Sequence, residues 1–558
     1  MDFNRYFTND EVESVLNGWA QNHQRLVKVT ELGKSHENWS IHLLTLTNEN
    51  TGSDEDKPAI WIDSNIHATE IAGTTVALHI AHTLLSGYGS DSRCTRLLDT
   101  VAFYIVPRLN PDGAALALSD SPKYVRSGTR PYPFSDPLAG LHEEDIDGDG
   151  RILQMRIPDP HGDWKVSTLD GRLMEKRGPD EHGGTYYRLL PEGRLEEFDG
   201  VEIKVARPFQ GLDFNRNFPF SWEPESTQAG AGPFPASEKE IRAAVDFISR
   251  HRNINVAVTY HTQSGVILRP YSTQPDEKME TSDLWVFELM GERGKELTGY
   301  PCLSVYHGFR YHPKEVTTGG FDDWVYDHFG IFSFTIELWD LPGRAGIKDR
   351  DFFEWMRKHP HEDDLKILRW LEENAAEAAL VDWYPFEHPQ LGPVEIGGYN
   401  RIFTWRNPPH SFMGEEAEKN TAFALSLADM LPRMTILSLT LKKLTNEGDY
   451  RLRLIVENGG FLPTYTSAQG RKREAARPVR VELDLPEGVR LASGKAKTEL
   501  GHLAGRSGKL SVSTMNAASP TDNRAWTEWV LRGPPGAEVG VEVRSDRGGT
   551  LHERVVLH

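Results

Sequence analysis

Apolar residues follow two spacings over residues 1–380. Short runs of adjacent apolar residues are typical of buried strands, and apolar residues three or four positions apart are typical of helices that cover a sheet. The runs predict strands at residues 41–46, 59–62, 101–106, 256–260 and 331–338. The helical spacing predicts helices near residues 12–19, 74–85, 237–249, 283–297 and 363–380. Strands that alternate with helices indicate an α/β fold with helices packed on a central sheet.

Three other regions differ in composition and in the pattern of their apolar residues. Residues from about 130 to 208 are rich in Gly, Pro, Asp and Arg, and we interpret them as an insertion into a first domain of residues 1–381. Residues 382–432 are rich in Pro and Gly and are predicted to be a connecting segment. Residues 433–558 contain short stretches in which apolar and polar residues alternate between turns, which predicts an all-β sandwich.

Composition and charge exclude several classes of protein. The 62 Lys and Arg against 82 Asp and Glu give a net charge of −20, which disfavours a nucleic-acid or anionic-membrane surface. Two cysteines do not make a disulfide framework. The chain contains no apolar run long enough to span a bilayer and no apparent signal peptide, so by default we expect a soluble protein of the cytoplasm.

Metal-ligating residue types follow two of the predicted strands. His67 and Glu70 come shortly after the run at 59–62, and His261 follows the run at 256–260. In open α/β sheets, side chains from separate loops converge at the carboxyl ends of strands. Two His and one Glu form a set that binds zinc and leaves one coordination position for water. The sequence therefore predicts one catalytic zinc site held by these three residues.

Such a site needs a base that is not itself a ligand. Glu337 ends the apolar run at 331–338, where a carboxylate is costly unless it is paired or used in chemistry. Beside a zinc site, where the pKa of water falls to about 7, it could accept a proton from that water. We predict that Glu337 is the general base.

The motifs His67-Ala-Thr-Glu70, Asp213-Phe-Asn-Arg-Asn-Phe, His261 and Thr335-Ile-Glu337, in this order, resemble the zinc metallocarboxypeptidases of the A/B type. The resemblance covers roughly residues 5–380 and implies a mixed central sheet, a zinc cofactor and a peptide substrate. It also implies that Asn215 and Arg216 bind the terminal carboxylate of the substrate. Arg126 is the match for the arginine that polarises the scissile carbonyl, and Arg130 is the second candidate for that role.

Two positions depart from the family pattern or specify it further. Glu315 stands where the family has a substrate-covering tyrosine, and we do not expect Tyr311 to replace that tyrosine. Asp322 occupies the position that sets side-chain preference, and an aspartate there resembles the selector for Lys or Arg. We interpret Glu315 and Asp322 as groups that favour a cationic terminal residue. Asp322 could instead cap a helix that follows it.

The insertion contains a second candidate metal site. Asp145, Asp147 and Asp149 alternate as in the first positions of an EF-hand calcium loop, although the closing position falls on Arg156, which cannot bind a cation. The same residues also fit an Asp/Gly turn held by side-chain hydrogen bonds.

The predicted activity is zinc-dependent hydrolysis of the C-terminal peptide bond of peptides, with a preference for basic terminal residues. One alternative is an amidase or peptidase that acts on a γ-glutamyl or cell-wall amide, which Glu315 suggests. Another is a non-catalytic binding protein, which the complete set of ligands and base disfavours. The sequence gives no expectation about the oligomeric state.

Overall fold

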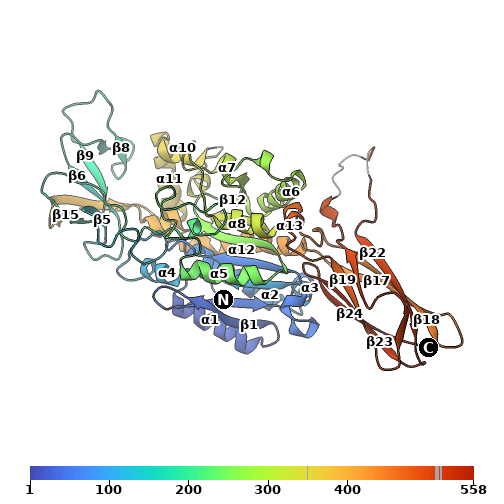
Figure 1. Cartoon of the computed structure of the whole chain (residues 1–558). Coiled ribbons are helices and arrows are strands. Elements are labelled where there is room, and N and C mark those ends of the chain that lie inside the picture. The colour runs from blue at the N-terminus through green and yellow to red at the C-terminus, as the bar shows by residue number, and fades with distance from the viewer. Residues whose placement is uncertain (349, 509–513, 516–517) are drawn as a thin grey trace.

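The computed structural model describes residues 1–348, 350–508, 514–515 and 518–558 (Figure 1). Its centre is a mixed eight-stranded sheet with the strand order β1-β2-β4-β3-β11-β14-β12-β13. The strands are β1 (Val27–Lys34), β2 (Ser40–Leu46), β3 (Ala59–Ser64), β4 (Ala102–Val106), β11 (Ile254–Thr262), β12 (Val266–Arg269), β13 (Cys302–Ser304) and β14 (Phe332–Leu338). The expected α/β class and mixed sheet are confirmed.

Helices cover both faces of this sheet because its central strands are apolar on both sides. In β3, Ile60 and Ile62 join one buried core and Trp61 joins the other. The first core is completed by α1 (Asn9–Asn22), α2 (Ala72–Gly87), α3 (Ser92–Thr100), α6 (Thr281–Thr298) and α12 (His410–Asp429). The second is completed by α5 (Lys239–Arg250) and α8 (Phe321–Phe329). None of the described helices is long and apolar enough to cross a membrane.

The central strands β3, β11 and β14 run parallel, so their carboxyl ends meet at one edge of the sheet. β11 lies between the other two, and His261 on β11 is directly paired with Glu337 on β14. Side chains at paired positions of adjacent strands project from the same face. This register brings the predicted third ligand and the predicted base together before any loop is considered.

The insertion forms an outer sheet with part of the segment predicted as a connection. β6 (Gln154–Pro158), β7 (Trp164–Val166), β8 (Met174–Lys176) and β9 (Tyr187–Pro191) join β15 (Val381–His388) and β16 (Gly392–Gly398) in the order β15-β16-β6-β9-β7-β8. β5 (Gly140–Glu143) and β10 (Gly193–Glu196) form a separate pair. Residues 381–398 therefore belong to this sheet. The helix expected at 363–380 is shorter, because α11 (His361–Asn374) ends before β15 begins.

The C-terminal region is an all-β sandwich, as expected. Its two sheets have the orders β17-β18-β22-β20 and β21-β19-β23-β24. The strands are β17 (Met434–Lys443), β18 (Asp449–Asn458), β19 (Val479–Asp484), β20 (Arg490–Ser493), β21 (Lys497–Gly501), β22 (Arg524–Arg532), β23 (Glu538–Ser545) and β24 (Gly549–Val556). Inward-facing residues such as Leu452, Val481 and Trp529 form its core. Fully buried Arg547 donates to the Phe329 carbonyl at 2.9 Å, which anchors the sandwich to the α/β domain.

Candidate metal and peptide site

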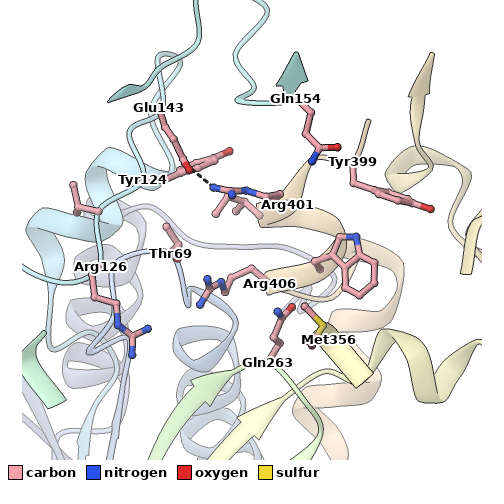
Figure 2. A pocket seen from close by; sticks show the side chains of 13 residues that line it. Thr69, Tyr124, Arg126, Glu143, Gln154, Gln263, Met356, Tyr399, Arg401 and Arg406 are labelled. Carbon is pink, nitrogen blue, oxygen red and sulfur yellow. Dashed lines mark hydrogen bonds and ion pairs between the residues drawn. The ribbon is translucent and has the colours of Figure 1, made fainter. Parts of the chain in front are cut away.

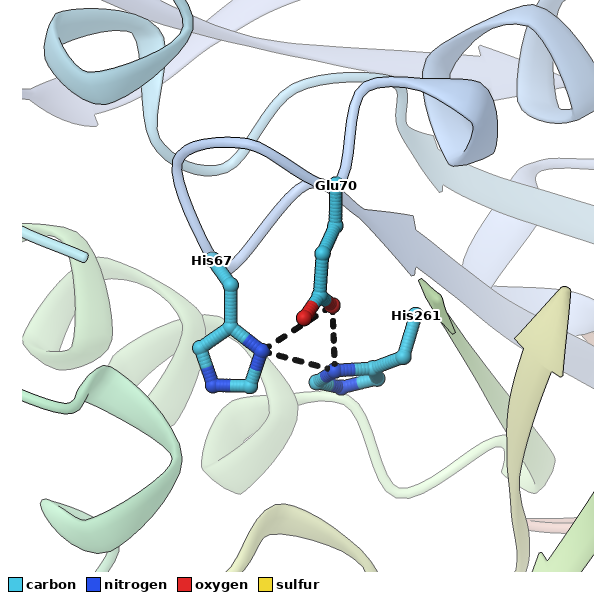
Figure 3. A group of neighbouring side chains, drawn as sticks. All are labelled: His67, Glu70 and His261. Carbon is cyan, nitrogen blue, oxygen red and sulfur yellow. Dashed lines mark hydrogen bonds and ion pairs between the residues drawn. The ribbon is translucent and has the colours of Figure 1, made fainter. Parts of the chain in front are cut away.

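His67, Glu70 and His261 converge at the carboxyl ends of β3 and β11 (Figure 3). Glu70 Oε2 lies 3.0 Å from Nδ1 of His67 and 3.0 Å from Nδ1 of His261. The two Nδ1 atoms are 3.1 Å apart. All three side chains are buried, so these polar atoms face one another with little access to water.

The chemistry of this donor set fits a zinc ion. Four ligands at about 2.0–2.1 Å in a tetrahedron lie roughly 3.3 Å from one another, close to the spacing of the three atoms. Burial raises the pKa of the Glu70 carboxyl, but the facing His67 and His261 outweigh it and hold that pKa well below its ordinary value. Burial lowers the pKa of His261. Ionised carboxylate and neutral imidazole are the forms that bind metal.

Asp213 contacts both His67 and Arg126 and helps to hold them in place. Its Oδ1 lies 3.0 Å from Nε2 of His67, and its Oδ2 accepts a 2.9 Å hydrogen bond from Nε of Arg126. Burial raises the pKa of Asp213, but Arg126, Arg216 and His67 outweigh it and hold that pKa well below its ordinary value. A carboxylate on the outer nitrogen of a metal-binding histidine fixes the ring and raises its basicity.

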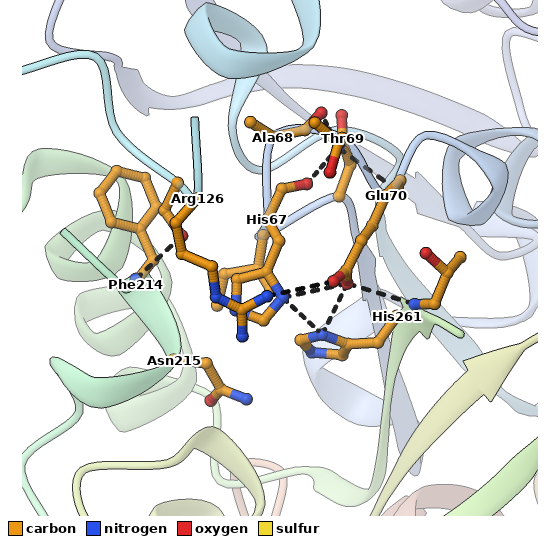
Figure 4. Close-up of polar contacts among 12 residues, drawn as sticks. His67, Ala68, Thr69, Glu70, Arg126, Phe214, Asn215 and His261 are labelled. Atoms are coloured by element: carbon orange, nitrogen blue, oxygen red, sulfur yellow. Dashed lines mark hydrogen bonds and ion pairs between the residues drawn. The ribbon is translucent and has the colours of Figure 1, made fainter. Parts of the chain in front are cut away.

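Arg126 joins this group from the segment before the insertion. Besides its bond to Asp213, its guanidinium approaches Oε1 of Glu70 at 3.4 Å, the carboxylate oxygen that faces away from His261 (Figure 4). Arg126 also lines a cavity of about 360 Å³ in front of the ligands. A fixed guanidinium at this place can donate to an oxygen of a bound substrate.

Glu337 lines the same cavity as Glu70, and it also lines a smaller neighbouring cavity with His67 and His261. In the described part of the chain, the groups that act on its carboxylate are neighbouring charges rather than hydrogen-bond donors. Burial, and next the negative charge of Glu70, raise the pKa of Glu337 well above its ordinary value. An unengaged carboxylate with a raised pKa is suited to accept and return a proton.

Arg216 lines the larger cavity, and Asn215 lines the smaller one, of about 50 Å³, which shares Arg126, Arg216 and Glu337 with it. The Asn215 side-chain oxygen accepts a 2.8 Å hydrogen bond from the Phe321 backbone, which ties it to the start of α8. The Arg216 guanidinium is held by the Asn215 carbonyl at 2.7 Å and lies within 3.8 Å of Asp213. Gly319 packs so closely that a Cβ there would lie 2.2 Å from the Arg216 carbonyl, with φ at +66°. The close approach and the left-handed backbone both require glycine.

A family model described as zinc carboxypeptidase matches residues 12–348, which is more than half of the chain. The chain belongs to the zinc carboxypeptidase family. A second model, described only as a domain of unknown function, matches residues 433–556. The catalytic-domain match therefore ends before the segment that carries β15 and β16.

Curated relatives of this chain are carboxypeptidases. Carboxypeptidase A2 of Rattus norvegicus is 25% identical over 346 residues, 61% of this chain, and the chain spans 64% of the length of that relative. Carboxypeptidase B of Astacus astacus is 25% identical over 354 residues, 61% of this chain and 88% of the relative. Among solved structures, carboxypeptidase A from Helicoverpa armigera has a TM-score of 0.41 and 19% identity, covering 68% of this chain and 76% of that chain.

One family-derived expectation is corrected by the structure. Glu315 is exposed and does not line the two cavities at the metal site. Tyr311 lines them instead, and the Arg216 guanidinium carbon lies 5.9 Å from the centre of its ring. Tyr311 lies four residues before Glu315 in the chain. No carboxylate from Glu315 faces the terminal-carboxylate end.

Arg126, Arg130 and Asp322 have different surroundings in the structure. Arg130 forms an ion pair with Glu238 at 2.7 Å, so Arg126 rather than Arg130 faces the metal ligands. Asp322 lies inside the first turn of α8, whose N-cap is Gly320, so the expected capping role is wrong. Its Oδ1 accepts the Asp323 backbone at 3.1 Å within the first turn of α8, and its side chain lines the end of the site near Arg216.

The calcium site expected at Asp145, Asp147 and Asp149 is not supported. Asp145 accepts backbone hydrogen bonds from Gly148 and Gly150, at 2.7 and 2.8 Å. The carboxylates of Asp147 and Asp149 accept further backbone bonds at 3.0 and 2.8 Å. These are the bonds of an Asp/Gly turn, which the same sequence pattern also fits.

Two side chains at the site were not anticipated from the sequence. The Arg406 guanidinium reaches Oε1 of Glu70 at 3.3 Å. Buried Asn407 donates to the Thr69 carbonyl at 2.8 Å and accepts from the Ala72 backbone at 3.0 Å, so it holds both sides of the Glu70 position. Both residues follow β16, far beyond the matched family region, and no local motif marks them.

Proposed function

We propose that this protein is a zinc-dependent carboxypeptidase that removes the C-terminal residue of peptides. The observation that carries the proposal is one cavity in which Glu337 stands beside Glu70 while the Arg216 guanidinium closes one end. A buried three-ligand set, an unengaged carboxylate and a fixed cation together supply what hydrolysis beside a free carboxylate requires. The same complete set disfavours a purely adhesive role.

Substrate binding begins at Asn215 and Arg216. A guanidinium can grip a carboxylate with two parallel hydrogen bonds, and the Asn215 amide adds a further donor. Because Arg216 is buried and held by backbone contacts, little ordering is needed when the substrate binds. The scissile carbonyl would then lie between Arg126 and Glu337.

The chemistry follows from the side chains around that carbonyl. Zinc held by His67, Glu70 and His261 would supply a Lewis acid and lower the pKa of water at the site. Glu337 would accept a proton from the attacking water and then donate it to the leaving amine. Arg126 would donate hydrogen bonds to the carbonyl oxygen as negative charge develops on it.

A preference for Lys or Arg at the terminal position is the finer part of the proposal. Asp322 is buried near Arg216 and Thr335, and burial raises the pKa of its carboxyl. A cationic substrate side chain would favour the ionised form of Asp322. Peptides that differ only in a terminal Lys, Arg, Phe or Glu test this preference, and equal rates for all four would contradict it.

The decisive experiment is the Glu337→Gln variant. Gln keeps the shape of the side chain but cannot hold the proton, so we expect the bound zinc to remain and peptide hydrolysis to fall by about three orders of magnitude. Metal analysis and a peptide assay on the same preparation measure both. Glu315→Gln is the matched control, because Glu315 is exposed outside the cavity, and it should keep near wild-type rates. Full turnover by Glu337→Gln would overturn the mechanism.

A further inference from the structure

A second cavity, of about 460 Å³, adjoins the first, and Figure 2 shows the side chains that line it. Its walls come from the segment just before the insertion, through Tyr124, from the insertion, through Glu143, and from the segment after β16, through Arg401 and Trp405. Most of the second wall lies outside the region matched by the zinc carboxypeptidase model. The cavity therefore combines residues inside the matched region with six residues beyond it.

The second cavity continues directly from the first. Arg126, Gln263 and Arg406 line both of them, whereas Arg216 lines only the first. A peptide whose terminal carboxylate is bound at Arg216 would place its scissile bond at Glu337. The part of the substrate that precedes the scissile bond would then extend past Arg406 into the second cavity.

The charges around this cavity favour an anion. Three guanidiniums line it, those of Arg126, Arg401 and Arg406, against the single carboxylate of Glu143. Arg401 is paired with Glu143 at 2.6 Å, and Arg126 is engaged by Asp213. Of the three guanidiniums, that of Arg406 is held least tightly by carboxylates. In the described part of the chain, its guanidinium has one carboxylate contact, Glu70 Oε1 at 3.3 Å, an oxygen of a proposed metal ligand.

The Arg406 backbone is held firmly in place. Asn407 ties it to the loop of Glu70 through its hydrogen bonds to Thr69 and Ala72. Two residues before Arg406, the Thr404 carbonyl accepts a 2.9 Å hydrogen bond from the indole of buried Trp339. The backbone that carries Arg406 is thus held at the cavity, while its side chain, 37% exposed, leaves the guanidinium accessible to a ligand.

We propose that this second cavity binds a carboxylate on the acyl side of the scissile amide, with Arg406 as its principal partner and Arg401 as its second. Two sources supply the same chemistry: an Asp or Glu side chain in the residue before the scissile bond, or the free α-carboxylate of a γ-linked glutamyl group. The proposal rests on the proposed carboxypeptidase function and specifies which substrates that site selects.

The test compares substrates that share a terminal Lys and differ only in the preceding residue. N-acetylated peptides with Glu, Gln or Lys at that position are assayed beside γ-Glu-Lys with the zinc-loaded protein. We expect kcat/KM for the Glu peptide or for the γ-linked substrate to exceed that for the Gln peptide by about tenfold, as a charge-assisted carboxylate contact provides. Whichever anionic substrate is faster identifies the source of the carboxylate.

The variants Arg406→Gln and Arg401→Gln should lower the ratio of anionic to neutral kcat/KM toward one, with the larger loss for Arg406. Arg406→Lys keeps the charge and should restore part of the ratio, which a general disturbance of Glu70 would not produce. Arg188→Gln is the matched control, because Arg188 lies on β9 of the outer sheet, pairs with Asp159 and does not line the cavity. Its ratio should equal that of the wild type.

The outcomes separate the two proposals. Equal kcat/KM for Glu, Gln, Lys and γ-linked substrates, with good turnover, overturns the acyl-side carboxylate site and leaves the carboxypeptidase function standing. Calorimetry of the same substrates with zinc-loaded Glu337→Gln measures binding alone. Tighter binding of the anionic substrates without wild-type turnover would support the cavity but contradict the proposed function. Neither turnover nor preferential binding would overturn both.

Discussion

Two clusters in this protein each place three ligand-type side chains within one ion's reach, yet they differ in almost every other respect. His67, Glu70 and His261 come from two strand ends far apart in the sequence and are buried. Asp145, Asp147 and Asp149 come from five consecutive residues, and Asp149 is exposed. The first cluster leaves its acceptor atoms facing one another. The second directs its carboxylates at its own backbone.

The difference lies in what holds each cluster together. Separate elements keep the first three side chains in place whether or not a cation is bound, and Asp213 and Asn407 brace them from outside. In the acidic loop, the backbone N–H groups already satisfy the carboxylates, so a cation would have to compete with existing hydrogen bonds. Convergence from distant segments is thus a stronger indication of a metal site than alternating acids in one loop.

Removing one converging ligand should have the largest effect. His261→Ala deletes one of three ligands from a buried site, so we expect zinc to be lost and peptide hydrolysis to fall to background. Metal analysis after dialysis and a peptide assay measure the two losses. His552→Ala on the exposed surface of β24 should keep both properties. Stoichiometric zinc in His261→Ala would break the assignment of the buried cluster.

Weakening the brace behind a ligand should have an intermediate effect. Asp213→Asn keeps the shape of the side chain but removes the charge that faces His67 and Arg126, so zinc affinity should fall about 10–100-fold. Competition with a chelator of known affinity measures the change. Asp246→Asn on exposed α5 is the control and should match the wild type. Unchanged affinity in Asp213→Asn would show that the ligands need no support from behind.

The acidic loop offers a test through stability. Burial raises the pKa of Glu192, which accepts the Ile146 and Leu153 backbone, from 4.5 to about 7. Between these values the folded protein retains a proton that the unfolded chain has lost, so stability should decrease as pH rises from about 4.5 to 7, by roughly 3 kcal/mol. Glu192→Gln should remove this contribution. Melting temperatures from pH 5 to 8 measure it, and identical pH slopes for both proteins would refute it.

The smallest effect is expected for calcium. Because hydrogen bonds within the turn satisfy the carboxylates, calorimetric titration with calcium should give the same heats for the wild type and Asp147→Ala. The variant should lose only about 1 kcal/mol of stability with its hydrogen bonds. A saturable calcium heat in the wild type that disappears in Asp147→Ala would show that the acidic loop is a cation site, as proposed for the buried cluster.

Sequence reasoning succeeded where a residue's place follows from its own strand. The apolar runs that end near His67, His261 and Glu337 predict the strands, and parallel pairing then sets those residues side by side. It failed where placement depends on a distant segment or on the path of a loop. Counting residues places Glu315 at the family's tyrosine position, but Tyr311, four residues earlier, is the one that lines the cavities. Arg406 is positioned by hydrogen bonds to residues more than 300 positions earlier, which no local pattern encodes.

The contact of Asn407 with Thr69 and Ala72 bears on how the protein is made. During translation, the loop that carries His67 and Glu70 leaves the ribosome long before residue 407 is synthesised. Until then, the loop lacks its hydrogen bonds to Asn407. A protein truncated after residue 381, at the apparent end of the first domain, would never form these hydrogen bonds. Expression of a shortened enzyme should therefore extend at least through α12, where the returning chain packs against α2.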